Sequence, residues 1–365
     1  MGEGRQEGLQ RGAPGWFVAG VALAIALAVL WLASAFLIPL VFALFLFMLL
    51  TALLDGLRNV RVLGRRVPSG LTHALSLLLL FAGIGGLLAM LSNQVELFSA
   101  ALPHYETRLD ALVGEAAGWV GDDIAESIDR ALDEINIAAS LSGALGSAGT
   151  ILTAFLLVGL YLAFLLADRE AFAAKLPLLF PEQEAYHRFR VLIRSVSLSV
   201  RRYLWIKTLT SLMTGAVAYL VMKPVGLDFA ETWALLAFFL NFIPSIGSVL
   251  GTVLPAILAL VQFTSLSPFL IILGGVGLAQ IVIGNVIEPA LMGRRLNLSP
   301  FMIILSLTFW AGLWGVSGAF LSVPITVVML IVCAQVPAWR PIAILLSRDG
   351  RLPLWEDEVG PPDAS

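Results

Sequence analysis

Long uninterrupted apolar runs constrain the fold of this chain more than any other feature. Residues 16–38, 71–91 and 268–287 each approach the ~20 apolar residues that a helix needs to cross a bilayer. Hydrophobic residues make up 59% of the 365 residues and charged residues only 13%, whereas a soluble domain carries about 25% charged residues. The sequence therefore predicts an all-α, polytopic integral membrane protein.

The loops between the first runs predict how the chain is oriented. Residues 16–54 are interpreted as a membrane hairpin of two paired helices that separate at Pro39, and 71–91 as a third span. The small residues 33–35 resemble a signal-peptide cleavage site, but a second apolar run follows at once, so we expect no cleavage. The positive-inside rule makes the loop 55–70 cytoplasmic. Its arginines are Arg58, Arg61, Arg65 and Arg66.

The next segment is predicted to leave the membrane. Residues 92–147 contain ten acidic residues and two arginines, and their apolar residues are spaced for amphipathic helices. This pattern predicts a small extracytoplasmic helical domain. A fourth span, 148–167, then leads to a basic amphipathic segment at 168–203, which is interpreted as cytoplasmic and as resting on the anionic inner leaflet.

Residues 204–336 are interpreted as the core of the molecule, because two long apolar runs in it contain helix-breaking residues. The run 232–262 is interrupted at 241–248, and the run 301–336 at 312–324. If the arginine pair between the runs is cytoplasmic, each run returns to the side it left, as a re-entrant hairpin. The alternative makes each run a single kinked span.

The two breaks supply the first candidate site residues. Backbone released from a helix inside a membrane must be satisfied by protein or water, so both breaks are expected to face a cavity. The alternative for the glycines is that they only let helices approach closely. The candidates are Asn241, Pro244, Ser245, Gly247 and Ser248 at the first break, and Gly315, Ser317, Gly318 and Pro324 at the second.

Three polar residues on the span between the breaks complete the candidate path. Gln280, Asn285 and Glu288 lie on that span or near its end. An ionisable group at membrane depth is costly, which makes Glu288 a candidate for coupling transport to a proton or cation. In the alternative, Glu288 is an interfacial anchor paired with Arg294 or Arg295, and the two amides link helices.

Missing motifs disfavour several classes of function. The net charge is −3 and no basic cluster alternates with aromatic residues, so we expect no nucleic-acid partner. The chain has no Walker-type loop and no His-Glu-x-x-His pair, so we expect no cofactor, no metal and no enzymatic activity. Gly-Val-Ser-Gly at 315–318 matches the pattern of intramembrane serine proteases. However, His73, His104 and His187 lie in loops or at a membrane edge, so a base is missing.

Three motifs in the second half have a characteristic order and spacing. They are Asn-Phe-Ile-Pro-Ser-Ile-Gly at 241–247, Glu-Pro-Ala-Leu-Met-Gly at 288–293 running through Leu-Ser-Pro at 298–300, and Gly-Val-Ser-Gly-Ala-Phe-Leu-Ser-Val-Pro at 315–324. Over 204–336 the chain resembles the autoinducer-2 exporter family of bacterial permeases. It departs from the family pattern at Ser245 and Ser248, which replace an aromatic residue and a proline.

This resemblance implies about eight membrane segments, a bacterial cytoplasmic (inner) membrane, and a homo-oligomer. It also implies that both termini, 1–15 and 337–365, are cytoplasmic. The functional or hinge positions that it implies are Asn241, Pro244, Gly247, Glu288, Pro289, Pro300, Gly315, Gly318 and Pro324.

The motifs and the resemblance predict a secondary transporter, or permease, with its transport core at 204–336. It would move a small polar signalling molecule or similar solute out of the cell by alternating access. One alternative is a sodium(lithium)/proton antiporter that uses Glu288, so the expected partners are a polar solute or a monovalent cation or proton, together with the lipid bilayer. A second alternative is a non-transporting membrane scaffold whose outer domain at 92–147 binds partners.

Overall fold

The computed structural model of the chain describes residues 15–58, 137–292 and 297–350, together with the single positions 85, 86, 94, 101, 105, 107 and 108. These residues form helices and no strand, with one isolated β-bridge between Leu298 and Ser347. The all-α prediction is confirmed for this part of the chain. The predicted span 71–91 lies outside the described residues except for 85 and 86. Of the predicted outer domain 92–147, the structure describes five single positions and residues 137–147, which form one helix with the predicted fourth span 148–167.

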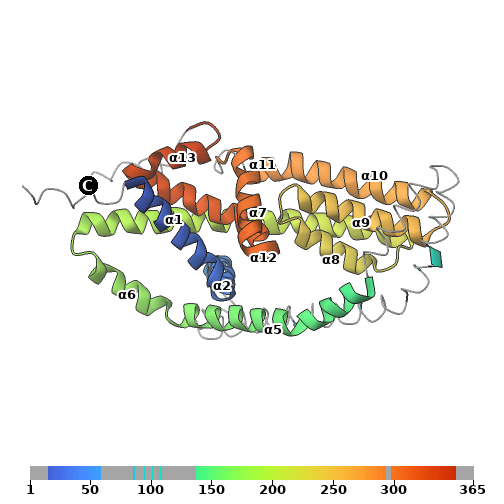
Figure 1. Ribbon diagram of the computed structural model, residues 1–365, viewed down its shortest axis with the longest axis horizontal. Helices are drawn as coiled ribbons and strands as arrows, with labels where there is room; N and C mark the ends of the chain where they lie inside the picture. The colour runs from blue at the N-terminus through green and yellow to red at the C-terminus, as the bar shows by residue number, and fades with distance from the viewer. Residues whose placement is uncertain are drawn as a thin grey trace, which may run out of the picture.

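Most helices run along the long axis of the molecule, and α2 crosses them (Figure 1). Their bounds are α1 (Gly15–Leu32), α2 (Ser34–Arg58), α5 (Ile137–Ala167), α6 (Arg169–Leu179), α7 (Gln183–Val225), α8 (Ala230–Leu240), α9 (Ile246–Gln262), α10 (Ser267–Val282), α11 (Glu288–Met292), α12 (Pro300–Gln335) and α13 (Arg340–Leu346). A π-helical turn, η1 (Ile283–Ile287), joins α10 to α11, and a 3-10 turn, η2 (Pro337–Trp339), joins α12 to α13.

The described helices are those of a polytopic membrane protein. Four stretches are long and apolar enough to cross a bilayer: Ser34–Thr51, Gln183–Val225, Ser267–Met292 and Pro300–Gln335. α5 and α6 are bent by 63° at their junction and add a fifth if they are counted as one span. α1, α8 and α9 are shorter apolar helices. The number of eight membrane segments stays a prediction.

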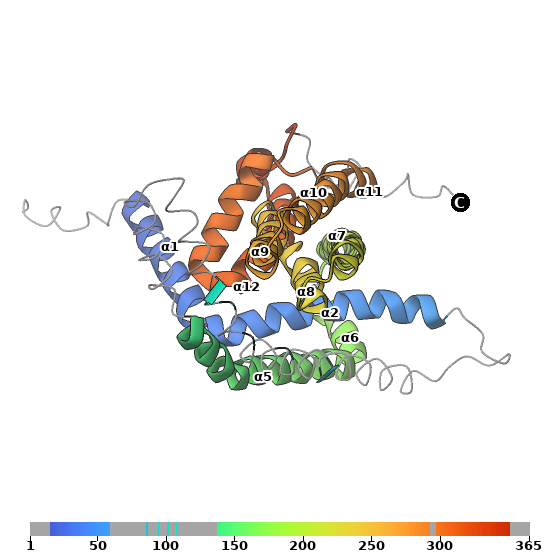
Figure 2. The same cartoon turned by 90° about the vertical axis from the view of Figure 1, so that its right-hand side faces the viewer.

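The first two helices separate at Ala33, not at Pro39 as predicted. Ala33 forms a turn between α1 and α2, and the two helices diverge from it (Figure 2). The Ala33 carbonyl accepts a 2.8 Å hydrogen bond from the N–H of Leu37, so the turn leaves this acceptor satisfied. Pro39 lies inside α2. It removes only one hydrogen bond, and the helix tolerates that loss near its start.

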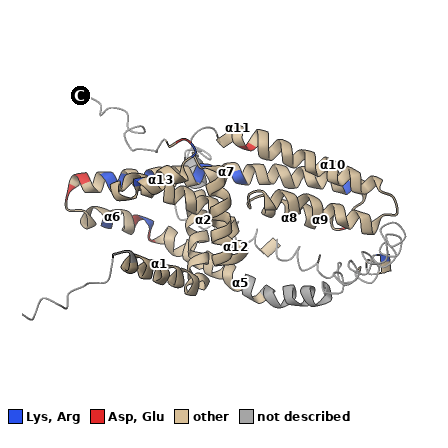
Figure 3. Cartoon of the chain, turned by 45° about the horizontal axis from the view of Figure 1, so that its top comes forward, with Lys and Arg blue, Asp and Glu red and all other residues tan. Residues whose placement is uncertain are grey.

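The longest helix, α7, joins two segments that the sequence analysis separates. It has 43 residues without a break, which makes it about 65 Å long, roughly twice the ~30 Å thickness of a bilayer's hydrocarbon core. Charged residues gather at the end of α7 beside α6, whereas α8, α9 and α10 are almost free of them (Figure 3). α7 therefore connects most of the predicted basic segment 168–203 to the following span as one helix. The placement of that segment on the leaflet stays a prediction.

α8 and α9 form an antiparallel helical hairpin that returns to its starting point. The backbone N–H of Asp228, just before α8, donates to Gln262 Oε1 at the end of α9 (2.8 Å), and Gln262 Nε2 donates to the carbonyl of Gly226 (2.9 Å). A Cβ added to Gly251 would lie 3.5 Å from Ala237, so the two helices pack closely along their middle. The break between them covers 241–245, within the predicted range.

α12 also folds back on itself, at a single residue. Gly315 has φ 62° and ψ −142°, a conformation that a glycine adopts without strain. The two limbs on either side face each other, because Ser306 Oγ donates to the carbonyl of Ser322 (3.2 Å). Pro324 was predicted to belong to the break but lies inside the second limb, where it is buried. The break is therefore narrower than 312–324.

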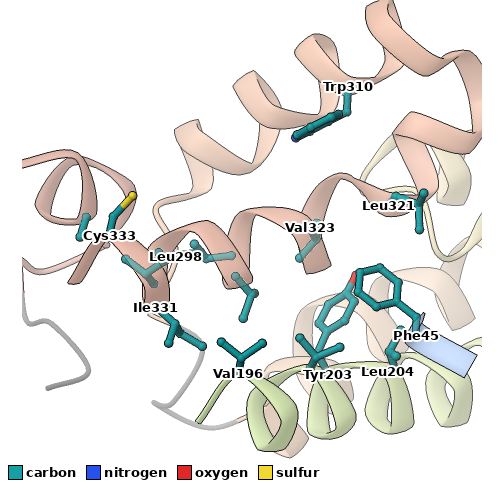
Figure 4. Packing of buried hydrophobic residues seen from close by; sticks show 14 of the residues in the cluster. Phe45, Val196, Tyr203, Leu204, Leu298, Trp310, Leu321, Val323, Ile331 and Cys333 are labelled. Atoms are coloured by element: carbon teal, nitrogen blue, oxygen red, sulfur yellow. The ribbon is translucent and has the colours of Figure 1, made fainter. Parts of the chain in front are cut away.

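Two apolar clusters share α7. The N-terminal half of α7 packs against both limbs of α12, against Phe45 of α2 and against Ala343 of α13 (Figure 4). The C-terminal end of α7, from Ala218 onward, packs instead against α8, α9 and α10. The helical ends of this second group are seen together in Figure 2. α7 is thus the helix on which the two parts of the molecule are joined.

Candidate functional site

The tips of the two hairpins touch. Phe242, at the first break, stacks on Phe320 in the second limb of α12, with ring centroids 4.5 Å apart and an angle of 19° between the planes. Ile243 packs against Leu307 and Ala319, one from each limb of α12. Two breaks are predicted from the sequence, but their contact is not. The contact joins the α8–α9 hairpin directly to α12.

The chain turns at the first break through one residue with a strained backbone, Ser245, and one glycine that allows close approach, Gly247. Ser245 is exposed and has φ 61°, which is unusual for a residue with a side chain. Ser248 Oγ donates to the carbonyl of Ser245 (3.0 Å) and so satisfies part of the freed backbone. A Cβ added to Gly247 would lie only 1.7 Å from the carbonyl oxygen of Leu240. Gly247 is therefore required for the hairpin to close, and Pro244 beside it is half-buried.

The second break also depends on a glycine that lies against a backbone carbonyl. A Cβ on Gly318 would lie 1.8 Å from the carbonyl oxygen of Trp310, so the limbs of α12 meet backbone to backbone. Ser317 is half-buried beside it. Trp314 packs on Trp310 and donates from Nε1 to the carbonyl of Leu30 in α1 (3.0 Å). The predicted alternative, close packing at the glycines, holds at Gly247 and Gly318.

Asn241 closes the first hairpin against α7. Its side chain is buried, and Nδ2 donates a 3.0 Å hydrogen bond to Ser211 Oγ. Asn241 is predicted from the sequence to be a ligand for a transported solute. In this arrangement its amide is engaged with α7, so a solute would have to replace Ser211 as its acceptor.

A buried ion pair lies between α7 and α11. Lys207 Nζ lies 2.8 Å from Glu288 Oε1 and 2.9 Å from Oε2, and the two side chains are 7% and 16% exposed. Thr210 Oγ1 donates to Glu288 Oε2 at 3.4 Å. A pair removed from water is stable only with such close geometry. Glu288 was expected to pair with Arg294 or Arg295, which lie outside the described residues.

Sequence reasoning missed Lys207 as a site residue. It was counted with the basic residues of the preceding segment, although it follows Leu204, Trp205 and Ile206 in an apolar stretch. A single lysine inside a run that continues to Met222 is the signal that could have found it.

The other two candidates on α10 and η1 differ in environment. Gln280 is 7% exposed, and its Nε2 has no hydrogen-bond partner among the described residues. Asn285 is exposed on the π-helical turn η1 and is not brought to the buried polar groups. In the described part of the chain, no three His, Cys, Asp or Glu side chains are placed to hold a metal ion.

One described residue of the outer segment reaches the base of the first hairpin. Tyr105 is buried, and its hydroxyl donates a 2.7 Å hydrogen bond to Asp228 Oδ2. Burial, and then the hydrogen bond and charge of Asp228, raise the pKa of Tyr105 well above its usual value, so the phenol stays protonated. This contact ties the segment 92–147 to the turn between α7 and α8.

Tyr105→Phe is expected to lower the thermal midpoint of the purified protein by about 1–2 °C. The loss corresponds to one hydrogen bond, about 1 kcal/mol, because the exposed Asp228 regains water. Differential scanning fluorimetry in detergent measures it. Asp228→Asn keeps an acceptor oxygen and is the matched control. Equal losses in both variants would contradict a role for the hydroxyl.

Long apolar helices, two broken hairpins that meet, and polar groups buried against α7 are features of a multi-pass membrane protein of the transporter class. A family model described as AI-2E family transporter matches residues 21–338. The chain belongs to this family. The resemblance inferred from three motifs is thus confirmed and extends over most of the chain.

Relatives of known name agree with this assignment. The AI-2 transport protein TqsA of Escherichia coli K12 is 33% identical over 324 residues, which cover 86% of this chain and 90% of that protein. The "Putative transport protein" of Haemophilus influenzae is 30% identical over 344 residues, which cover 89% and 94%. The "Putative transport protein YhhT" of Escherichia coli K12 is 40% identical over 147 residues, 40% of this chain and 42% of that protein.

Proposed function

We propose that this protein is a secondary transporter that exports a small, uncharged polar solute, with autoinducer-2 as the first candidate. The observation that carries the proposal is the contact of two broken hairpins, Phe242 on Phe320, beside a buried polar group of α7. Paired broken helices mark the binding site in many secondary transporters. The name of the relative TqsA supports autoinducer-2 as cargo.

Alternating access would use the division into two clusters. α8, α9 and α10 pack on the C-terminal half of α7, whereas α2, α12 and α13 pack on its N-terminal half. Phe242 and Phe320 form a flat aromatic contact between these groups. We assign the moving surface to this contact, because it lies between the two groups. α7 is then the element about which the groups rotate.

The ion pair favours an uncharged cargo over a cation. Glu288 already holds the Lys207 ammonium at 2.8 Å, so the pair is neutral as a whole. A sodium ion would have to displace Lys207 and leave that ammonium unpaired in a desolvated place, which is costly. An antiporter that exchanges sodium or lithium for protons at Glu288 is the second candidate, because Glu288 is the more exposed partner.

We also place the protein in the bacterial inner membrane, with both termini in the cytoplasm and 92–147 outside. The excess of basic residues at 55–70 and 168–203 supports this orientation. The hairpins α8–α9 and α12 are then re-entrant. Of their limbs, α8 is about 16 Å long, whereas α9 and the two limbs of α12 are about 22–30 Å long. Self-association into a homo-oligomer is part of the same proposal.

Flux through proteoliposomes tests the proposed function. We expect the purified protein to carry autoinducer-2 down its gradient at least ten-fold faster than empty liposomes, and to carry no protons in response to a sodium gradient. Both fluxes are followed for the parent and for Glu288→Gln. Sodium-dependent proton flux that disappears in the variant would instead make this an antiporter. If the parent protein gives no flux in either assay, transport of both cargoes is contradicted and the non-transporting membrane scaffold is favoured.

A further inference from the structure

Two polar atoms buried near α7 and α10 lack a hydrogen-bond partner among the described residues. They are Thr214 Oγ1 and Gln280 Nε2, and their residues are 2% and 7% exposed. A helical threonine often donates to the carbonyl four residues back, as Thr208 does to Leu204 (2.7 Å). An unpaired polar group in a buried place destabilises the folded state. Two such groups call for a partner that is not part of the described chain.

The register of α7 and α10 sets these two residues at the same level. The helices run antiparallel, because a Cβ on Gly275 would touch Val221 while Glu288 binds Lys207. Thr214 lies halfway between Lys207 and Val221 along α7. Gln280 lies close to halfway between Gly275 and Glu288.

The same faces of the two helices carry the ion pair. Thr214 is seven residues, or nearly two turns, beyond Lys207 and so lies on the same face of α7. Gln280 and Glu288 would be about 80° apart around an ideal α-helix. The π-helical turn between them has more residues per turn and reduces this angle, which brings both side chains toward α7. π-helical turns inside α-helices are frequent at functional sites.

Glycine and alanine residues lie next to the layer of α7 and α10 that contains Thr214 and Gln280. The Gln280 amide lies over Gly251 of α9, since a Cβ there would be 3.4 Å from Nε2. On the other side, a Cβ on Gly215 would lie 2.9 Å from the Ala234 carbonyl oxygen. Beyond this level the facing sides of α7 and α10 bury apolar residues such as Met222 and Ile272. Thr214 and Gln280 thus continue the row of polar groups on α7 and α10 that begins at the ion pair.

The charges around this level decide which ligand it suits. Along α7 from 204 to 222, and on α9, α10 and α11, the only ionisable groups with a formal charge are Lys207 and Glu288, and they neutralise each other. An ion beside Thr214 and Gln280 would find no counter-charge and would be strongly disfavoured. A neutral oxygen, in contrast, accepts from the amide N–H and pairs with the hydroxyl.

We propose that Thr214 and Gln280 form a binding site for an uncharged small molecule that bears hydroxyl or carbonyl oxygens. One oxygen of the ligand accepts from Gln280 Nε2 and pairs with the Thr214 hydroxyl. The inference rests on the proposed function, because it names the site at which the exported solute is held. Binding is therefore measured separately from flux.

Equilibrium dialysis of autoinducer-2 against the purified full-length protein in detergent tests the site, with D-ribose as a second uncharged probe. The variants are Thr214→Val and Gln280→Leu, which keep shape and remove the polar atoms. The matched control is Thr208→Val on the same helix, whose hydroxyl bonds its own helix. We expect each site variant to weaken binding at least ten-fold and the control to bind as the parent does.

The thermal midpoint separates a ligand site from a structural one. Thr214→Val removes an unpaired buried hydroxyl, so its midpoint without ligand is expected to equal or exceed that of the parent. A fall of several degrees with binding retained would show that a structural water serves these groups and would overturn the proposal. Failure of the parent to bind either probe would also overturn it. Binding without flux would leave the site standing and remove the transport function.

Discussion

Gly318→Ala is expected to abolish transport and to destabilise the protein by about 3 kcal/mol or more. The added Cβ would lie 1.8 Å from the Trp310 carbonyl oxygen, and real Cβ atoms do not approach closer than 3.0 Å. Both overlapping atoms are held close to backbone, so no side chain can rotate away. The limbs of α12 must separate, which removes the contact of Phe320 with Phe242. The thermal midpoint and the flux assay both report the change.

Gly312→Ala is the matched control for this variant. Gly312 lies on the same helix, its backbone has a negative φ, and a Cβ there would touch nothing within 4 Å. Alanine is the better helix former by about 1 kcal/mol, so the control is expected to be as stable as the parent or more so. Equal behaviour of Gly312→Ala and Gly318→Ala would contradict the hairpin geometry of α12.

Lys207→Met is expected to destabilise the protein by about 3–5 kcal/mol, because it leaves the Glu288 carboxylate buried without its counter-charge. Methionine fills nearly the same volume, so the loss is one of charge and not of packing. The double variant Lys207→Met with Glu288→Gln removes both charges and is expected to regain most of the stability. Thermal midpoints of the two single variants and the double variant give the coupling between the residues.

The exposed pair Lys223–Glu231 supplies the control for the ion pair. Its nitrogen and oxygen are 2.6 Å apart, but both side chains are open to solvent. Water replaces the lost partner there, so Lys223→Met is expected to leave the thermal midpoint unchanged. A loss at Lys223 as large as that at Lys207 would show that burial is not what makes the inner pair important. Additive single and double variants at Lys207 and Glu288 would contradict direct coupling.

The sequence predicts the membrane class and the places of both helix breaks, because these depend on local properties. Apolar run length determines whether a helix can span, and proline, serine and glycine at 241–248 determine where one ends. The predicted positions of helix breaks are less accurate where a single proline was the main reason to expect a break. Pro39 and Pro324 both lie inside helices, because a single missing hydrogen bond is tolerated when packing holds the chain on either side.

The parts of the site that could not be predicted depend on residues far apart in the chain. Lys207 and Glu288 are separated by 81 positions, and no local pattern tells which basic residue faces a given carboxylate. Thr214 reads as an ordinary helical threonine and is distinguished only by the bond that it does not make. The contact of Phe242 with Phe320 likewise requires both hairpins to be folded.

Because α7 is one continuous helix, a movement of one end displaces the other end. Its N-terminal arm carries arginines, and the following part of the same helix carries Lys207 and Thr214. A tilt of about 5° displaces the end of a 65 Å helix by about 6 Å. A ligand that binds this arm, whether an anionic lipid surface or another protein, therefore displaces the buried groups without touching them. Movement of the charged arm and movement of the buried polar groups are movements of a single helix.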